Sequence, residues 1–89
     1  MINYNIIIKG KVQGVWFRKY TQDVAYSLNL TGFVRNCDDG SVFIEVEGNQ
    51  ETLEVFMDRL RIGPHRANVT EIICNKSRLK SFTKFVVAY

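Results

Sequence analysis

The chain has 89 residues, of which 46% are hydrophobic and 24% are charged, and its net charge at pH 7 is +3. This length suits one domain with a modest core, and this composition excludes a disordered chain, because the apolar surface is large enough to offset chain entropy. No stretch approaches the roughly 20 apolar residues of a membrane span, and the first residues lack the features of a signal peptide. We therefore expect a single domain over residues 1–89, which is soluble, cytoplasmic and without a membrane partner.

The two cysteines, Cys37 and Cys74, have neither the spacing of a metal site nor that of a CxxC motif. Neither begins a C-x5-R phosphatase loop, because the residues six positions on are Phe43 and Lys80. A small secreted domain normally carries more cysteines, joined as disulfides. We expect two reduced thiols in a cytoplasmic protein and no nucleophilic cysteine.

The first part of the chain predicts a strand, a loop, a helix and a second strand. Apolar residues alternate over residues 4–9, as in a β-strand with one buried face. Apolar residues then recur at three- and four-residue spacing over residues 17–28, which predicts an amphipathic helix. A strand is expected over residues 32–36. The helix residues expected to be buried are Phe17, Tyr20, Val24 and Leu28.

The turn residues 38–40 predict a hairpin into a third strand with one buried and one exposed face. The residues expected on the buried face are Val42, Ile44 and Val46. Those expected on the exposed face are Ser41, Phe43, Glu45 and Glu47.

A second helix is expected to begin after Asn49, whose side chain is predicted to cap it, with Glu51 in the first turn. Gly63 and Pro64 end it. Its apolar stripe is Leu53, Phe56, Met57 and Leu60. Strands are predicted over about residues 68–75 and 82–89. The order β-α-β-β-α-β, with one extra C-terminal strand, predicts an α+β ferredoxin-like fold: two helices on one face of a mostly antiparallel sheet.

The loop from Gly10 to Arg18, with the sequence GKVQGVWFR, joins the first strand to the first helix. A glycine-containing turn at a helix N-terminus exposes main-chain N–H groups, to which an anion can bind. Arg18 adds a permanent charge and a planar donor fork that matches phosphate or carboxylate. From these residues alone, a tight turn beside a solvated arginine is an equal alternative.

For several other residues, a purely structural interpretation stands beside the functional one. Asn36 ends a strand: it either caps the following turn with its own side chain, which the spacing favours, or holds a water molecule beside the anion site. Asp38 and Asp39 fit a turn better than a cation site. His65 is expected to be a solvated loop residue rather than a general base, and Trp16 either lines a pocket or covers the core.

Two segments of the chain resemble the signatures of the acylphosphatase family. Residues 10–18 are similar to its G-x-V-Q-G-V-x-F-R loop. Residues 32–48, GFVRNCDDGSVFIEVEG, are similar to its G-aromatic-V-x-N-x3-G-x-V-x5-G motif. Gly63-Pro64 with Ala67 and Val69, and the ending FVVAY, resemble two further family stretches. The resemblance covers nearly the whole chain.

The resemblance implies hydrolysis of acyl phosphates to a carboxylate and inorganic phosphate. It implies that Arg18 binds the phosphate and that Asn36 positions the attacking water. The main-chain N–H groups implied to hold the phosphoryl oxygens are those of Gly14, Val15, Trp16, Phe17 and Arg18. Two departures are the bulky Trp16 and Ala88, which stands where many members carry a basic residue.

The residues suit this reaction without a metal or cofactor. The leaving carboxylate has a conjugate acid with a pKa of about 4 to 5 and departs without a general acid. Fixed donors then stabilise the charge on the equatorial oxygens. We expect direct attack by water, with no covalent phosphoenzyme, in a monomer whose partners are the acyl phosphate and inorganic phosphate.

The alternative is a non-catalytic module that binds an anion or RNA. Gly32-Phe33-Val34 faintly resembles a strand signature of RNA-recognition modules, but the second aromatic residue of that signature is replaced by Arg35. We therefore expect no stacking platform and no nucleic-acid partner. The basic residues Lys76, Arg78 and Lys80 have the spacing of a solvated face.

Overall fold

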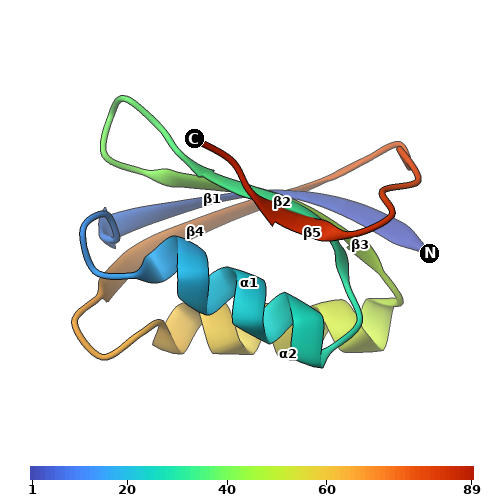
Figure 1. Ribbon diagram of the computed structural model, residues 1–89, viewed down its shortest axis with the longest axis horizontal. Coiled ribbons are helices and arrows are strands. Elements are labelled where there is room, and N and C mark those ends of the chain that lie inside the picture. The colour runs from blue at the N-terminus through green and yellow to red at the C-terminus, as the bar shows by residue number, and fades with distance from the viewer.

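Two helices cover one face of a five-stranded sheet in the computed structural model, which describes all 89 residues (Figure 1). The predicted ferredoxin-like α+β arrangement is thus confirmed. The elements are β1 (Ile2–Lys11), α1 (Phe17–Ser27), β2 (Thr31–Asn36), β3 (Val42–Gly48), α2 (Gln50–Ile62), β4 (Asn68–Ser77) and β5 (Phe85–Val87).

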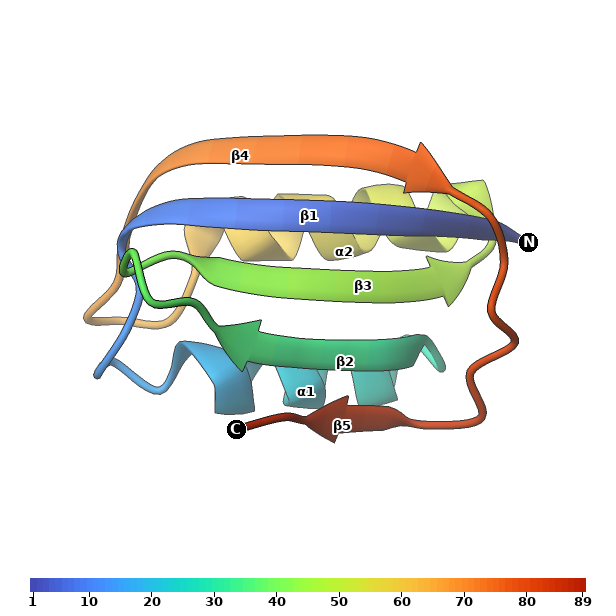
Figure 2. The same cartoon turned by 90° about the horizontal axis from the view of Figure 1, so that it is seen from above.

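The strands lie in the order β4-β1-β3-β2-β5 (Figure 2). All neighbouring pairs are antiparallel except β2 and β5, which are parallel. The pairing of β1 with β3 runs from Ile2 opposite Gly48 to Ile8 opposite Val42. Beyond this point β1 pairs only with β4, as far as Lys11. The chain therefore leaves the centre of the sheet just before the loop that leads to α1.

A cluster of 17 buried hydrophobic residues fills the space between the sheet and the helices. Two of them, Val12 and Val15, belong to the β1–α1 loop (residues 12–16), and their side chains are 1% and 5% exposed. Burying such a side chain contributes about 1.5–3 kcal/mol. The loop is therefore anchored to the core at two points rather than free in solution.

The helices begin and end largely as expected. The predicted apolar stripe of α2 is buried, and Glu51 lies in the first turn. Asn49 is the N-cap residue of α2, as predicted, but its side chain makes no capping hydrogen bond. Gly63 ends α2 with φ 67°, a conformation that glycine adopts without steric cost. Neither helix is long and apolar enough to cross a membrane.

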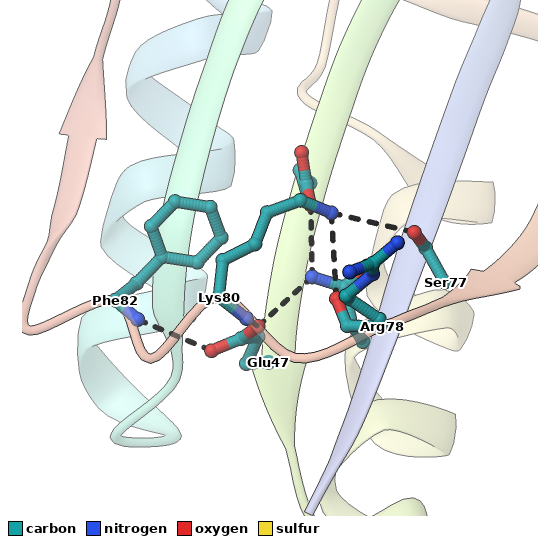
Figure 3. Close-up of polar contacts among 7 residues, drawn as sticks. Glu47, Ser77, Arg78, Lys80 and Phe82 are labelled. Carbon is teal, nitrogen blue, oxygen red and sulfur yellow. Dashed lines mark hydrogen bonds and ion pairs between the residues drawn. The ribbon is translucent and has the colours of Figure 1, made fainter.

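The prediction that Glu45 and Glu47 are exposed is wrong: they are only 7% and 3% exposed. The connection between β4 and β5 (residues 78–84) passes beside them and supplies their partners (Figure 3). Glu47 accepts hydrogen bonds from the main-chain N–H groups of Lys80 (2.6 Å) and Phe82 (3.2 Å). Asn3 Nδ2 donates to both carboxylates at 2.9 Å. The alternation of apolar and polar residues along β3 does not show that a segment later in the chain will cover the polar face of that strand.

The same connection explains two further differences. Lys80 is not merely solvated, since its Nζ lies 2.6 Å from Glu45 Oε2. The last strand covers Phe85–Val87 rather than residues 82–89; Phe82 lies before it, in the connection, where its main-chain N–H donates to Glu47. The end of the chain, Ala88 and Tyr89, extends beyond β5 towards the first turn of α1.

Candidate active site

The β1–α1 loop presents a row of unused main-chain donors at the start of α1. Gly14 and Trp16 have positive φ values, of 72° and 64°, and successive N–H groups in such mixed left- and right-handed backbone form a concave anion-binding nest. None of the N–H groups from Gly14 to Arg18 donates a hydrogen bond within the protein. The free donors and the positive end of the helix dipole therefore meet at one place.

The backbone of Trp16 is held in a left-handed conformation that non-glycine residues rarely adopt. Trp16 is 79% exposed, so the alternative that it covers the core is wrong. Such strain is a recurrent feature of functional loops. Phe17, the next residue, is 1% exposed and anchors the first turn of α1 to the core.

Arg18 lies in this first turn and is half-buried. Its Nη1 donates a hydrogen bond of 3.4 Å to the carbonyl oxygen of Ala88, and its guanidinium carbon lies 4.7 Å from the centroid of the Tyr89 ring. Ala88 N in turn donates to Val34 O of β2 at 2.8 Å. The C-terminal residues therefore link Arg18 to β2, two residues before Asn36.

Asn36 ends β2 and shares the face of the sheet on which Val34 is fully buried under the helices. Its Oδ1 is buried and accepts no hydrogen bond from the protein. The alternative that Asn36 caps the following turn is wrong. Asp39 does so instead, because its Oδ1 accepts from Ser41 N (3.0 Å) and Ser41 Oγ (2.6 Å), and these hydrogen bonds lower the pKa of Asp39.

Arg18 lies on α1 and Asn36 at the end of β2, on the face of the sheet that the helices cover, and Ala88 contacts both Arg18 and Val34. The β1–α1 loop and the β2–β3 turn lie at the same end of the molecule (Figures 1 and 2). A buried polar acceptor without a partner is costly. The unpaired Asn36 Oδ1, like the Oδ1 atoms of Asn3 and Asn5, is therefore free to accept a hydrogen bond from a water molecule or another donor.

Sequence reasoning missed two contributors to this site. Gln13 donates two hydrogen bonds from its side chain to the β2–β3 turn, and its place inside the first motif was the available signal. Ala88 has only a methyl side chain, yet its main-chain carbonyl oxygen accepts a hydrogen bond from Arg18. A main-chain contact of this kind leaves no trace in the residue type.

The cysteines and the histidine do not form a second site with one another. Cys37 and Cys74 are free, and desolvation raises the pKa of the Cys74 thiol, which lies on β4 at the far edge of the sheet. His65 is exposed. No group of three or more His, Cys, Asp or Glu side chains is placed to hold a metal ion.

A surface hollow of about 570 Å³ lies away from these residues, at the start of α2. It is lined by Asn49, Gln50, Glu51 and Glu54. Two carboxylates and no cation line it, so it repels an anion. The free main-chain donors and a cation meet instead at the surface formed by the loop and Arg18.

The uncovered face of the sheet carries an aromatic cluster that was not expected. The Phe33 ring centroid lies 5.8 Å from that of Phe43 and 6.0 Å from that of Phe82. Phe43 and Phe82 come from outside the motif that resembles the RNA-recognition signature. The rings pack on one another, and the Arg35 guanidinium lies over Phe43 at 4.9 Å.

Comparison with known proteins identifies the family. The acylphosphatase family model matches residues 4–87. The chain is 41% identical to the acylphosphatase of Bacillus licheniformis and 38% identical to that of Archaeoglobus fulgidus, with full coverage of both chains in each case. The crystal structure of acylphosphatase from Bacillus subtilis superposes with a TM-score of 0.97 at 39% identity, covering all of both chains. The chain therefore belongs to the acylphosphatase family of hydrolases, which act on acid anhydrides.

Proposed function

We propose that this acylphosphatase holds the phosphoryl group of an acyl phosphate with the main-chain N–H groups of Gly14–Arg18 and the guanidinium of Arg18. The observation that carries the proposal is the row of N–H groups without protein acceptors beside a half-buried arginine. Phosphoryl transfer spreads charge over three equatorial oxygens. Donors fixed in advance stabilise that charge without reorganising during the reaction.

Asn36 is proposed to position the attacking water. Its unpaired Oδ1 accepts a hydrogen bond from the water, whose oxygen then faces the phosphorus on the side opposite the leaving group. A neutral amide is too weak a base to remove the proton. The proton therefore passes to an oxygen of the bound phosphoryl group as the new P–O bond forms. The old P–O bond breaks, the carboxylate leaves, and inorganic phosphate is released.

The leaving group explains why no general acid is required. A carboxylate with a conjugate-acid pKa near that of a glutamate side chain, about 4.3, is stable without a proton at neutral pH. The N–H groups and Arg18 stabilise the negative charge on the phosphoryl oxygens, which a metal ion does in other phosphoryl-transfer sites. The reaction is accordingly proposed to need neither metal nor cofactor and to form no phosphoenzyme.

We also propose that the enzyme works as a monomer in the cytoplasm and does not act through nucleic acid. Both cysteines are free thiols, which fits a reducing compartment. The proposed groups all come from one chain, so a second copy is not needed to complete the site.

A hydrolysis assay with benzoyl phosphate tests the function, and the loss of absorbance of this substrate measures the rate. We expect turnover that is unchanged by a metal chelator and inhibited competitively by inorganic phosphate. Absence of hydrolysis would instead favour the non-catalytic anion-binding module. Complete loss of activity with the chelator, restored by added metal, would contradict the metal-free mechanism.

A further inference from the structure

Gln13 joins the β1–α1 loop to the turn between β2 and β3. Its Nε2 donates one hydrogen bond of 2.8 Å to the carbonyl oxygen of Cys37 and another of 2.8 Å to that of Ser41. No other hydrogen bond connects residues 12–16 with residues 36–41. One side-chain amide therefore supplies the whole polar link between these two segments.

The sheet itself does not provide this link. β1 and β3 separate after Ile8, and β1 then follows β4 on the side away from the turn. Val12 and Val15 hold the loop against the core, but apolar burial is non-directional. The two hydrogen bonds of Gln13 are directional, so they determine how the loop is oriented relative to the turn.

The two ends of this link adjoin the two halves of the proposed site. Gln13 directly precedes Gly14, the first proposed donor, and Cys37 directly follows Asn36. We infer that Gln13 is a positioning residue, which holds the phosphoryl-binding N–H groups in register with the amide that orients the water. This inference rests on the proposed function. A misplacement of about 1 Å between reacting groups can lower the rate by about 10²-fold.

Loss of the link is expected to separate turnover from phosphate binding. In Gln13→Met, Cys37 O keeps its hydrogen bond from Gly40 N (3.2 Å), and Ser41 O keeps that from Cys37 N (2.9 Å). The turn therefore stays closed. The product phosphate contacts the loop and Arg18 but does not need the water-positioning group. We expect kcat to fall by about 10- to 100-fold, with the inhibition constant for phosphate within about threefold of the wild type.

Gln22→Met is a matched control. Gln22 Nε2 also donates to a main-chain carbonyl, that of Phe85 at 3.3 Å, but from the body of α1. The same chemical group is lost without touching the β2–β3 turn, so kcat is expected to stay at the wild-type value. Steady-state hydrolysis of benzoyl phosphate is measured for both variants, with the folded fraction read from thermal unfolding. A wild-type kcat in folded Gln13→Met, or a parallel loss of kcat and phosphate affinity, overturns the inference.

Gln13→Glu provides a second readout, which a merely structural role does not produce. The carboxylate faces two carbonyl oxygens and repels them, which raises its pKa above the ordinary value of about 4.3. Once protonated, the carboxyl group donates one hydrogen bond. We expect kcat of Gln13→Glu, relative to the wild type at the same pH, to rise as the pH falls from 7 to about 5. A flat ratio over this range contradicts the inference.

Failure of this inference differs from failure of the proposed function. A wild-type protein that does not hydrolyse benzoyl phosphate, or an Arg18→Lys variant with wild-type turnover, defeats the proposed function. An active wild type, an inactive Arg18→Lys and a fully active Gln13→Met defeat only the role of Gln13. The same assay series therefore decides both.

Discussion

The guanidinium carbon of Arg18 lies 4.7 Å from the centroid of the ring of Tyr89, the last residue of the chain. The side chain proposed to bind phosphate is therefore positioned partly by the C-terminus. The carbonyl oxygen of Ala88 accepts a hydrogen bond from the same guanidinium at 3.4 Å. The rotamer freedom of a long arginine side chain is thereby reduced before substrate binds, which lowers the entropic cost of binding.

Tyr89→Ala is expected to weaken phosphate binding modestly. An exposed cation–π contact contributes about 0.5–1 kcal/mol, which corresponds to an increase of about two- to fivefold in the inhibition constant for inorganic phosphate. Tyr89→Phe keeps the ring and should match the wild type. Equal loss in both variants would show that the hydroxyl group, not the ring face, acts on Arg18.

Arg18→Lys is expected to lower kcat/KM by at least about 10²-fold, because an ammonium lacks the planar fork of the guanidinium. The inhibition constant for phosphate should rise as well. Arg35→Lys is the matched control: Arg35 lies over Phe43, on the uncovered face of the sheet. Comparable losses in the two variants would point to general charge rather than a specific site.

Asn36→Ala is expected to lower kcat by about 10²-fold while the phosphate inhibition constant changes by less than about threefold. Stability should behave differently from activity. Removing the buried, unpaired Oδ1 relieves a desolvation cost. The melting temperature of the variant is therefore expected to equal or exceed that of the wild type. Equal losses of kcat and phosphate affinity would instead place Asn36 among the phosphate-binding groups.

The stability of the fold is expected to fall at acid pH through Glu47. Desolvation raises the pKa of Glu47, but hydrogen bonds from Asn3, Lys80, Phe82 and Ser81 together outweigh it and hold this pKa below the ordinary value. Because the folded-state pKa is the lower one, Glu47 stabilises the fold above its unfolded-state pKa. This contribution is lost as the pH falls through the folded-state pKa.

Glu47→Gln checks this expectation. The variant keeps the shape of the side chain but loses its charge and one of the two oxygens that accept hydrogen bonds from Lys80 N and Phe82 N. Its free energy of unfolding at pH 7 is expected to be lower by about 1.5–3 kcal/mol. Its stability should also change less than that of the wild type between pH 5 and pH 3, as measured by urea unfolding. An identical pH dependence in the two proteins would rule out Glu47 as the titrating group.

Much of the fold was predictable because it depends on local periodicity. The stripe of α2 and the buried face of β3 follow from the spacing of apolar residues. The errors arose where distant segments meet. Glu45 and Glu47 alternate as exposed residues do, yet the β4–β5 connection covers them more than 30 residues later in the chain. Asn49 has the residue type of a cap, but its side chain makes no capping bond.

By itself, the sequence determined the identity of the donors and the chemistry open to them. A glycine-containing loop ahead of a helix exposes N–H groups, and an arginine in the first turn adds a matching cation. Only the tertiary structure decided that these N–H groups remain unpaired, that the chain's end contacts Arg18, and that Gln13 links the loop to the residue after Asn36. The physical reason is that hydrogen bonds depend on distances and angles between residues far apart in the chain, and no local pattern encodes these.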